Sequence, residues 1–463
     1  MSDLNHKRET FYSRLGFIFL SAGCAIGLGN VWRFPFITGK YGGAAFVLIY
    51  LLFLIALALP ILIMEFSVGR ASRKSPLSAF ETLQPKNKIW SLWGYGSWIG
   101  CTLLMMFYTV VTGWMLAYTF YSAKGSLTGI QSNEVGAFFG GLLSNPQEMM
   151  SWMALAILIG SAVCYLGLRN GVERITKFVM GGLLIIMFAL VARAVTLEGE
   201  SKGFEFYLKP DFEKLMADGI GNTLYAALGQ AFFTLSLGVG SMEIFGSYLP
   251  RENERTLLGE SLIVASLDTF VAFMAGLIIF PSCFAYGITP DAGPGLIFVT
   301  LPNMFNFMPA GRLWGALFFL FMSFAALSTV IAVFEAITAC FMDKFNWSRK
   351  FSVVVMTVLI FILSIPCALG FNIWSNFEPL GTGTNVLDLE DFILSDNLLP
   401  IGALVYLLFC VSKYGWGWKN FLNEANRGHG AKFSNALYLY VKYIIPTVML
   451  IILVVGYYNR FAK

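Results

Sequence analysis

The chain contains eleven stretches of mostly apolar residues, each long enough to cross a lipid bilayer as a helix. A spanning helix needs about 20 apolar residues. Apolar residues make up 57% of this sequence and charged residues only 13%, so little is left for a soluble domain. The sequence therefore predicts an all-α polytopic membrane protein with eleven transmembrane helices. We expect these helices at residues 15–37, 43–69, 90–123, 151–169, 172–195, 219–249, 257–287, 311–343, 351–371, 391–416 and 436–459.

Basic residues gather in alternate loops between these stretches. Lys and Arg near the ends of spans mark the cytoplasmic side, so we predict a cytoplasmic segment 1–14 and, with an odd number of spans, an external carboxyl terminus. The first stretch is too long for a cleavable signal peptide. We expect a multi-pass protein of a plasma membrane such as the bacterial inner membrane, and no nucleic-acid binding. The basic residues are Lys7, Arg8, Arg14, Arg70, Arg73, Lys74, Lys86, Lys88, Arg169, Arg174, Lys177, Arg251, Arg255, Lys344, Arg349, Lys350, Lys413, Lys419, Arg427 and Lys432.

Glycines interrupt the first and sixth stretches, at residues 23–30 and 234–241. Within lipid such an interruption is tolerated where the freed backbone groups line a cavity; close helix packing on glycine is the alternative. Two breaks five helices apart indicate a five-plus-five inverted repeat with broken helices 1 and 6, and breaks at matched positions point to a transporter's binding site. We predict a first repeat at 15–200, a second at 201–420, and a final helix with the carboxyl terminus at 421–463.

Four acidic residues fall in predicted spans, where an ionisable group is a candidate for function: Glu65, Glu243, Asp268 and Glu335. Asp268 lies mid-span and is predicted to ligate Na⁺, with a structural hydrogen bond as the alternative. Glu65 and Glu335 lie towards helix ends, where a cap or a polar network is an equal alternative. Glu243 lies close to the second break, and the sequence gives no other account of it.

The other polar and sulfur-containing side chains indicate no enzyme chemistry. Ser328 and Thr329 offer hydroxyls that suit a hard cation, or that bond back to their own helix. All seven cysteines lie in apolar stretches, which favours buried packing. His6 and His429 cannot form a metal site between them, so we expect no metal beyond alkali ions. No nucleotide-binding loop or nucleophile and base pattern is present; the rival to a transporter is a ligand-gated channel or sensor on the same scaffold.

The interrupted segments also carry the motifs of a known family. Residues 14–16 read Arg-Leu-Gly, and residues 25–35 read Ala-Ile-Gly-Leu-Gly-Asn-Val-Trp-Arg-Phe-Pro. Further motifs occupy residues 42–46, 50, 229–238, 246–248 and 426–428. Across essentially its whole length the chain resembles the neurotransmitter:sodium symporter family, in its bacterial eleven-helix branch of amino-acid transporters. The resemblance implies sodium-coupled import of an amino acid by alternating access, and no enzyme activity.

The resemblance also implies two sodium sites. The first would consist of the Ala25 carbonyl, the side chains of Asn30, Thr234 and Asp268, and the substrate carboxylate. The second would consist of carbonyls and hydroxyls of Gly23, Ile26, Ala325, Ser328 and Thr329. Because the substrate itself completes the first site, binding of ion and substrate would be coupled directly.

The implied substrate site surrounds the first break. The substrate carboxylate would meet the amides of Leu28 and Gly29 and the hydroxyl of Tyr108. Gly27 stands where monoamine carriers have an aspartate, which favours an amino acid over an amine. The apolar pocket favours a hydrophobic or aromatic L-amino acid, with another zwitterion such as an omega-amino acid as the alternative. The predicted substrate residues are Ala25, Gly27, Leu28, Gly29, Leu104, Tyr108, Phe233, Thr234, Ser236, Val239, Thr329 and Val333.

Two gates are implied at the two ends of the pathway. The outer gate would pair Arg33 with Asp391, although Asp388 and Asp396 are close enough to take this role, and would close Tyr108 and Phe233 as a lid. The inner gate would pair Arg8 with Asp343. The inner-gate residues also include two neighbours of this pair, Ser247 and Tyr248.

Asp268 replaces an asparagine of chloride-dependent relatives. A fixed carboxylate can substitute for a bound anion, so we predict that chloride is not required. Asp268 would then be a candidate for protonation when the empty carrier returns. The expected partners are a small zwitterion and membrane lipids, with the chain as a monomer or weak dimer.

Overall fold

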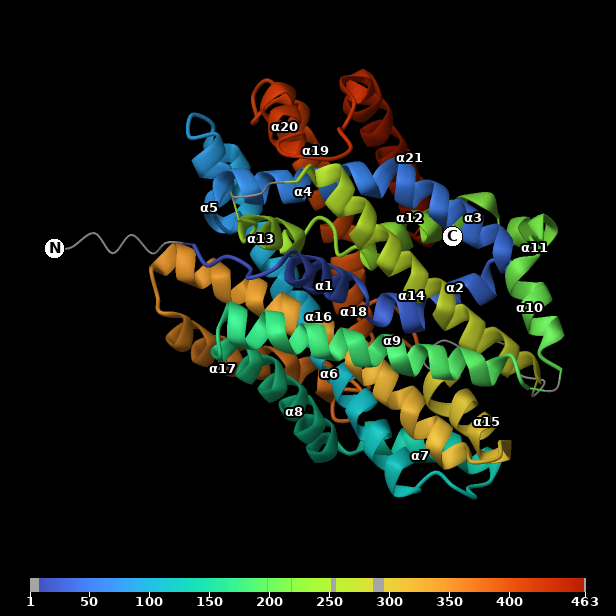
Figure 1. Ribbon diagram of the computed structural model, residues 1–463. Coiled ribbons are helices and arrows are strands. Elements are labelled where there is room, and N and C mark those ends of the chain that lie inside the picture. The colour runs from blue at the N-terminus through green and yellow to red at the C-terminus, as the bar shows by residue number, and fades with distance from the viewer. Residues whose placement is uncertain (1–7, 198, 218, 251–254, 286–294, 462–463) are drawn as a thin grey trace.

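The computed structural model describes residues 8–461 apart from residues 198, 218, 251–254 and 286–294 (Figure 1). The described residues form helices and turns and no β-strand. The first seven residues of the predicted cytoplasmic segment, including His6 and Lys7, lie outside the described part of the chain, as does Arg251.

Nine helical spans of the described chain are long and apolar enough to cross a membrane. Several of them contain a π-helical or 3₁₀ turn (η) within a longer helix. The spans are Ala44–Ser72 (α3 Ala44–Phe53, η2 Leu54–Ala58, α4 Leu59–Ser72), Lys88–Lys124 (η3 Lys88–Trp90, α6 Ser91–Lys124), α8 Pro146–Tyr165, Leu168–Ala194 (η4 Leu168–Glu173, α9 Arg174–Ala194), α14 Leu257–Ala285, α16 Gly311–Phe345, α17 Arg349–Leu369, Val386–Val411 (α18 Val386–Asp391, η6 Phe392–Leu398, α19 Leu399–Val411) and Asn435–Asn459 (η7 Asn435–Leu437, η8 Tyr440–Ile444, α21 Ile445–Phe461).

The first and sixth predicted helices are both broken, as expected. The first consists of α1 (Arg14–Ala25), η1 (Gly29–Arg33) and α2 (Phe34–Lys40), bent by 49°, and counts as a tenth span if taken as one. The sixth consists of α12 (Ile220–Thr234) and α13 (Ser241–Ser247), separated by residues 235–240. Neither α12 nor α13 reaches spanning length alone, so the exact number of eleven helices stays a prediction, as do the repeat boundaries.

Short helices cover the two ends of the bundle (Figure 1). α5 lies beside α13 towards the amino-terminal end, whereas α7, α10, α11 and α15 lie at the opposite end. α20 lies above α19 in this view and packs on α4. These elements are α5 Pro76–Leu83, α7 Ser132–Ser144, α10 Ser201–Leu208, α11 Phe212–Ala217, η5 Leu296–Thr300, α15 Leu301–Phe307 and α20 Trp418–Ala425.

The broken helix α1 lies in the centre of the bundle, in contact with α9, α14 and α16 (Figure 1). Its start is fixed by the Ser13 side chain, which accepts a hydrogen bond from the Gly16 N–H. Helical hydrogen bonding stops after Ala25, because Ile26 takes a ψ of 87°. The carbonyls at this end and the N–H groups that follow are thereby free to bind side chains of neighbouring helices.

The second break depends on left-handed backbone conformations. Ser236, Gly238 and Gly240 have φ angles of 50°, 92° and 74°, and glycine adopts such angles without strain. Gly238 also lies against the backbone of α19: an added Cβ would stand 2.2 Å from the Leu399 oxygen, and a Cβ on Gly402 would stand 2.2 Å from the Gly238 oxygen. Glycine at both positions therefore allows this close approach.

Glycines also bring α4 and α13 into backbone contact. A Cβ added to Gly69 would lie 1.8 Å from the Glu243 carbonyl oxygen, and one added to Gly246 would lie 2.5 Å from the Phe66 oxygen. Small residues permit such close packing between membrane helices. The two helices therefore form a tight pair next to the second break.

We expect Gly69→Ala to destabilise the protein by about 1–3 kcal/mol, the usual penalty for overpacking, because backbone atoms have to move apart. Thermal unfolding of detergent-purified protein measures this loss. The matched control is Gly181→Ala in α9, where an added Cβ meets no atom within 4 Å. Equal melting temperatures for the two variants would contradict the close contact.

Candidate functional site

Three of the four residues predicted for the first sodium site meet in the buried centre of the bundle. The Thr234 hydroxyl lies 3.2 and 3.0 Å from the two carboxylate oxygens of Asp268. Asn30 Nδ2 donates to Asp268 Oδ1 at 2.8 Å and to its backbone oxygen at 2.9 Å. None of these three side chains is exposed, so the carboxylate depends on these two donors. Ala25, the fourth predicted residue, lies in the wall of the adjoining cavity.

The Asn30 amide is held in one orientation. Its side-chain oxygen accepts a hydrogen bond from the Gly27 N–H at 3.3 Å, while its nitrogen faces Asp268. Carboxylate, amide and hydroxyl oxygens together suit a hard cation. The cluster fits Na⁺, provided that the Asn30 and Thr234 donors turn away from Asp268 as the ion binds.

The five residues predicted for the second sodium site also lie together, between the end of α1 and the middle of α16. The Ser328 hydroxyl donates to the Ala325 oxygen at 2.8 Å and lies 3.2 Å from the Ile26 oxygen. The Thr329 hydroxyl lies 3.3 Å from the Gly23 oxygen. All of these groups are oxygen ligands without charge, and hydroxyls and carbonyls suit a hard cation.

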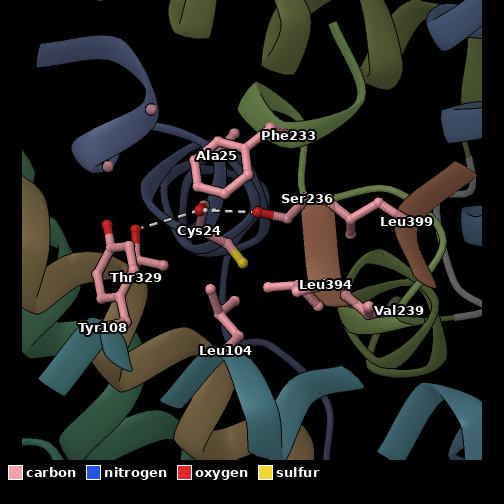
Figure 2. A pocket seen from close by; sticks show the side chains of 12 residues that line it. Cys24, Ala25, Leu104, Tyr108, Phe233, Ser236, Val239, Thr329, Leu394 and Leu399 are labelled. Atoms are coloured by element: carbon pink, nitrogen blue, oxygen red, sulfur yellow. Dashed lines mark hydrogen bonds between the residues drawn. The ribbon is translucent and has the colours of Figure 1, made fainter. Parts of the chain in front are cut away.

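A small cavity, of about 20 Å³, lies beside both clusters (Figure 2). Its wall contains nine of the predicted substrate residues: Ala25, Gly27, Gly29, Leu104, Tyr108, Phe233, Ser236, Val239 and Thr329. Leu28 is not part of this wall, although its N–H donates to the Tyr108 hydroxyl oxygen, and the Thr234 hydroxyl donates to Asp268. Val333 is fully buried in α16 but is not part of this wall.

Three residues of the wall were not predicted: Cys24, Leu394 and Leu399. The Cys24 carbonyl accepts hydrogen bonds from Ser236 and Thr329, at 3.3 and 3.2 Å (Figure 2). Leu394 and Leu399 come from η6 and α19. Both are leucines of the predicted tenth span, and no sequence signal marks them as cavity residues; they reach the cavity because α19 packs on Gly238.

The polar end of the cavity is formed by the break in α1. The Leu28 N–H donates to the Tyr108 hydroxyl oxygen at 2.8 Å. A Cβ on Gly27 would stand 2.3 Å from this oxygen and 2.5 Å from the Thr329 hydroxyl. Any side chain at position 27 would therefore enter the space between these two polar groups.

A larger cavity, of about 340 Å³, opens on the other side of Tyr108 and Phe233. The predicted outer-gate pair lines it, with 3.8 Å between Arg33 Nη1 and Asp391 Oδ1. The Arg33 guanidinium also lies over the Phe233 ring, 4.6 Å from its centroid. Of the alternative acids, Asp388 caps the start of α18, accepting from the Asn385 N–H at 2.8 Å. The geometry favours Asp391 as the partner of Arg33.

The predicted inner-gate residues are in contact at the amino-terminal end of the bundle. Arg8 donates to both carboxylate oxygens of Asp343, at 3.0 and 2.9 Å, and to the Ser247 hydroxyl at 2.7 Å. Its guanidinium lies 4.6 Å from the Tyr248 ring centroid. Phe11 packs edge-on against the same ring, so this end of the pathway is closed.

Glu335 belongs to a polar network behind this gate, one of the alternatives that its sequence position left open. It accepts from the Tyr248 hydroxyl at 2.6 Å and pairs with Arg349 at 2.6 Å. Arg349 in turn pairs with Glu9 at 3.1 Å. The network ties the amino-terminal segment to α16 and α17.

Comparison with known proteins agrees with this arrangement. The model of the sodium:neurotransmitter symporter family matches residues 8–135 and 142–462. The chain belongs to this family. It is therefore a sodium-dependent symporter, a multi-pass membrane protein and not an enzyme.

Bacterial relatives match nearly end to end. The sodium-dependent transporter YhdH of Bacillus subtilis is 35% identical over 95% of this chain and 96% of its own length. A sodium-dependent transporter of Haemophilus influenzae is 32% identical over 98% of this chain and 99% of its own. Among solved structures, MhsT in complex with L-phenylalanine is 36% identical, with a TM-score of 0.88 over 97% of this chain and 100% of that one.

We expect Thr234→Val to raise the sodium concentration needed for half-maximal stabilisation by about tenfold or more. A hydrogen bond to a charged group contributes about 1.5–3 kcal/mol, and 1.4 kcal/mol corresponds to about a factor of ten. Thermal unfolding in a sodium titration without substrate measures the shift. Thr357→Val is the matched control, because that hydroxyl only donates to the Val353 oxygen of its own helix. Identical titrations for both variants would remove Thr234 from the site.

Proposed function

We propose that this symporter imports an amino acid with a hydrophobic or aromatic side chain, together with sodium ions. The observation that carries the proposal is the two-ended cavity: the break in α1 supplies its polar end and leucine and valine side chains supply its other end. A small zwitterion with an apolar side chain matches this cavity, because its charged groups fit the polar end and its side chain fits the apolar end. Precisely placed polar groups fix orientation in such sites, and apolar walls provide most of the contact.

At the polar end, the substrate carboxylate would replace the Tyr108 hydroxyl as the partner of the Leu28 N–H. Tyr108 could then donate to that carboxylate. The half-helix that begins at η1 also directs its positive dipole end towards this position. The substrate carboxylate would in turn complete the cluster of Asn30, Thr234 and Asp268 around one sodium ion, which couples ion and substrate.

At the apolar end, Leu104, Val239, Leu394 and Leu399 would surround the side chain of the substrate. An omega-amino acid is disfavoured, because its amine would lie among these side chains without a counter-charge. The solved structure of the relative MhsT is a complex with L-phenylalanine. The same class of substrate is our proposal for this chain.

We further propose that the amino terminus is cytoplasmic, so that the Arg8–Asp343 pair closes the cytoplasmic path. Alternating access would then break this pair as the outer gate closes. Two sodium sites and a monomeric or weakly dimeric state remain predictions.

We expect L-phenylalanine, L-tryptophan or L-leucine to raise the melting temperature in sodium chloride and not in potassium chloride. A ligand at 100 times its Kd stabilises the folded state by about 2.7 kcal/mol. γ-Aminobutyric acid is tested in the same assay as a representative omega-amino acid. Gly27→Ala is the control, because its methyl group would fill the polar end of the cavity and abolish the ligand effect. Stabilisation by γ-aminobutyric acid alone, or equal effects in potassium, would overturn the proposed substrate class or the coupling.

Chloride independence is the second part of the proposal. Asp268 is buried, and its charge acts on the nearby Tyr50 hydroxyl. A fixed negative charge here removes the need for a bound anion.

We expect wild-type uptake into proteoliposomes to be equal in sodium chloride and sodium gluconate. Asp268→Asn should lose uptake in gluconate and recover part of it in chloride, because a halide can then supply the missing charge. Radiolabelled L-phenylalanine is the probe. A strict chloride requirement of the wild-type protein would disprove this part of the proposal.

A further inference from the structure

Two buried carboxyl groups lie outside both sodium clusters and outside the substrate cavity. Glu65 of α4 and Glu243 of α13 have no exposed surface. They stand on two helices whose backbones touch at Gly69 and Gly246, and the charge of Glu65 acts on Glu243. A buried ionisable residue in a membrane span is a candidate for function, and nothing in the proposed transport site accounts for this pair.

Each carboxyl is held by one oxygen and leaves the other without a partner. Glu65 Oε1 accepts from the Gly238 N–H at 2.5 Å, and the Glu243 backbone N–H also approaches this carboxyl. Glu243 Oε2 accepts from the Tyr406 hydroxyl. Glu65 Oε2 and Glu243 Oε1 are buried and form no hydrogen bond within the described residues.

Two buried hydroxyls lie in the same region: that of Ser97 is close to Tyr406, and that of Ser241 is close to Cys24 and Cys101. A Cβ on Gly240 would stand 2.7 Å from the Tyr406 hydroxyl and 3.3 Å from the Ser97 hydroxyl. The polar cluster therefore adjoins the second break, directly beside the residues that close the substrate cavity.

The charged and titratable groups around the pair do not neutralise it. The cation that acts on Glu243 is Arg8, and Arg8 is already engaged by Asp343 at 2.9 Å. The neighbouring groups are Cys24 of α1, Cys101 of α6, Cys340 and Asp343 of α16, and Tyr406 and Cys410 of α19. Two adjacent buried carboxylates without a free cation cannot both stay ionised.

We propose that Glu65 and Glu243 together hold one proton while the inner gate is closed, and release it when that gate opens. Glu243 is the protonated partner, because Glu65 keeps the backbone N–H donors that favour a carboxylate. Opening of the Arg8–Asp343 pair admits water from the amino-terminal side, and the proton leaves to that side. Acidification of that side therefore favours the closed form.

The proton of this pair is independent of the identity of the substrate and lies at a site distinct from Asp268. Glu243 thereby has a role that its position near the second break did not explain.

The test is infrared spectroscopy of the full-length protein in sodium chloride, prepared with natural glutamate and with glutamate carrying ¹³C in its side-chain carboxyl. We expect a carboxylic-acid C=O band that shifts with the label, which separates it from any band of Asp268. Glu243→Gln should abolish this band. All of these proteins carry Glu390→Gln, which removes the band of another buried glutamate, that of α18. The control variant Glu260→Gln, whose carboxylate pairs with Arg14 at 2.9 Å, should keep the band.

Coupling to the gate is tested with Arg8→Ala. The gate is open when buried Cys340, which adjoins Arg8 and Asp343, becomes reactive to maleimide. We expect the labelled band to disappear in that state. If the protein with Glu243 intact shows no band that shifts with the label, the proposal is overturned, whatever the Glu243 variant shows. A band that survives Glu243→Gln, or that persists while Cys340 is reactive, overturns it as well.

Discussion

Inside a membrane, backbone N–H and C=O groups that lose their helical hydrogen bonds need other protein groups as partners. The centre of this molecule depends on the side chains that supply these partners at the breaks in the first and sixth helices. At the end of α1, side chains of α6, α16 and the second break take up the freed groups. At the second break, Glu65, Trp93 and Cys101 hold the turn. The contacts are those of Ser236 and Thr329 with Cys24, Ser328 with Ile26, Tyr108 with Leu28, Glu65 and Trp93 with Gly238, and Cys101 with Val239.

The groups that satisfy the first break are also the groups proposed to bind ion and substrate. The hydroxyls of Tyr108, Thr329 and Ser328 form hydrogen bonds with the backbone groups that an amino acid or a cation would otherwise contact. Binding at this place therefore exchanges one set of hydrogen bonds for another and exposes no new backbone group. Such an exchange keeps the buried polar groups paired throughout, which matters because an unpaired one costs about 1–3 kcal/mol.

Much of this architecture could be predicted from the sequence because its signals are local. Glycines mark both breaks, and hydrophobic length marks the spans, with boundaries off by a few residues. The break in the sixth helix was predicted, and it separates helices of 15 and 7 residues. Leu394 and Leu399 carry no polar mark, and the Glu243–Tyr406 contact joins residues 163 positions apart. Likewise, only geometry favours Asp391 over Asp388 at the outer end.

The contact between Gly238 and Gly402 has a mechanical consequence. The second break touches α19 backbone to backbone, while α13 is fastened to α4 through Gly69 and Gly246. A tilt of α13 must therefore carry α4 with it and must turn about the point where Gly238 rests on α19. We expect α19 to act as the pivot of this motion. It can remain nearly still while α12 and α13, on either side of residues 235–240, rotate in opposite directions.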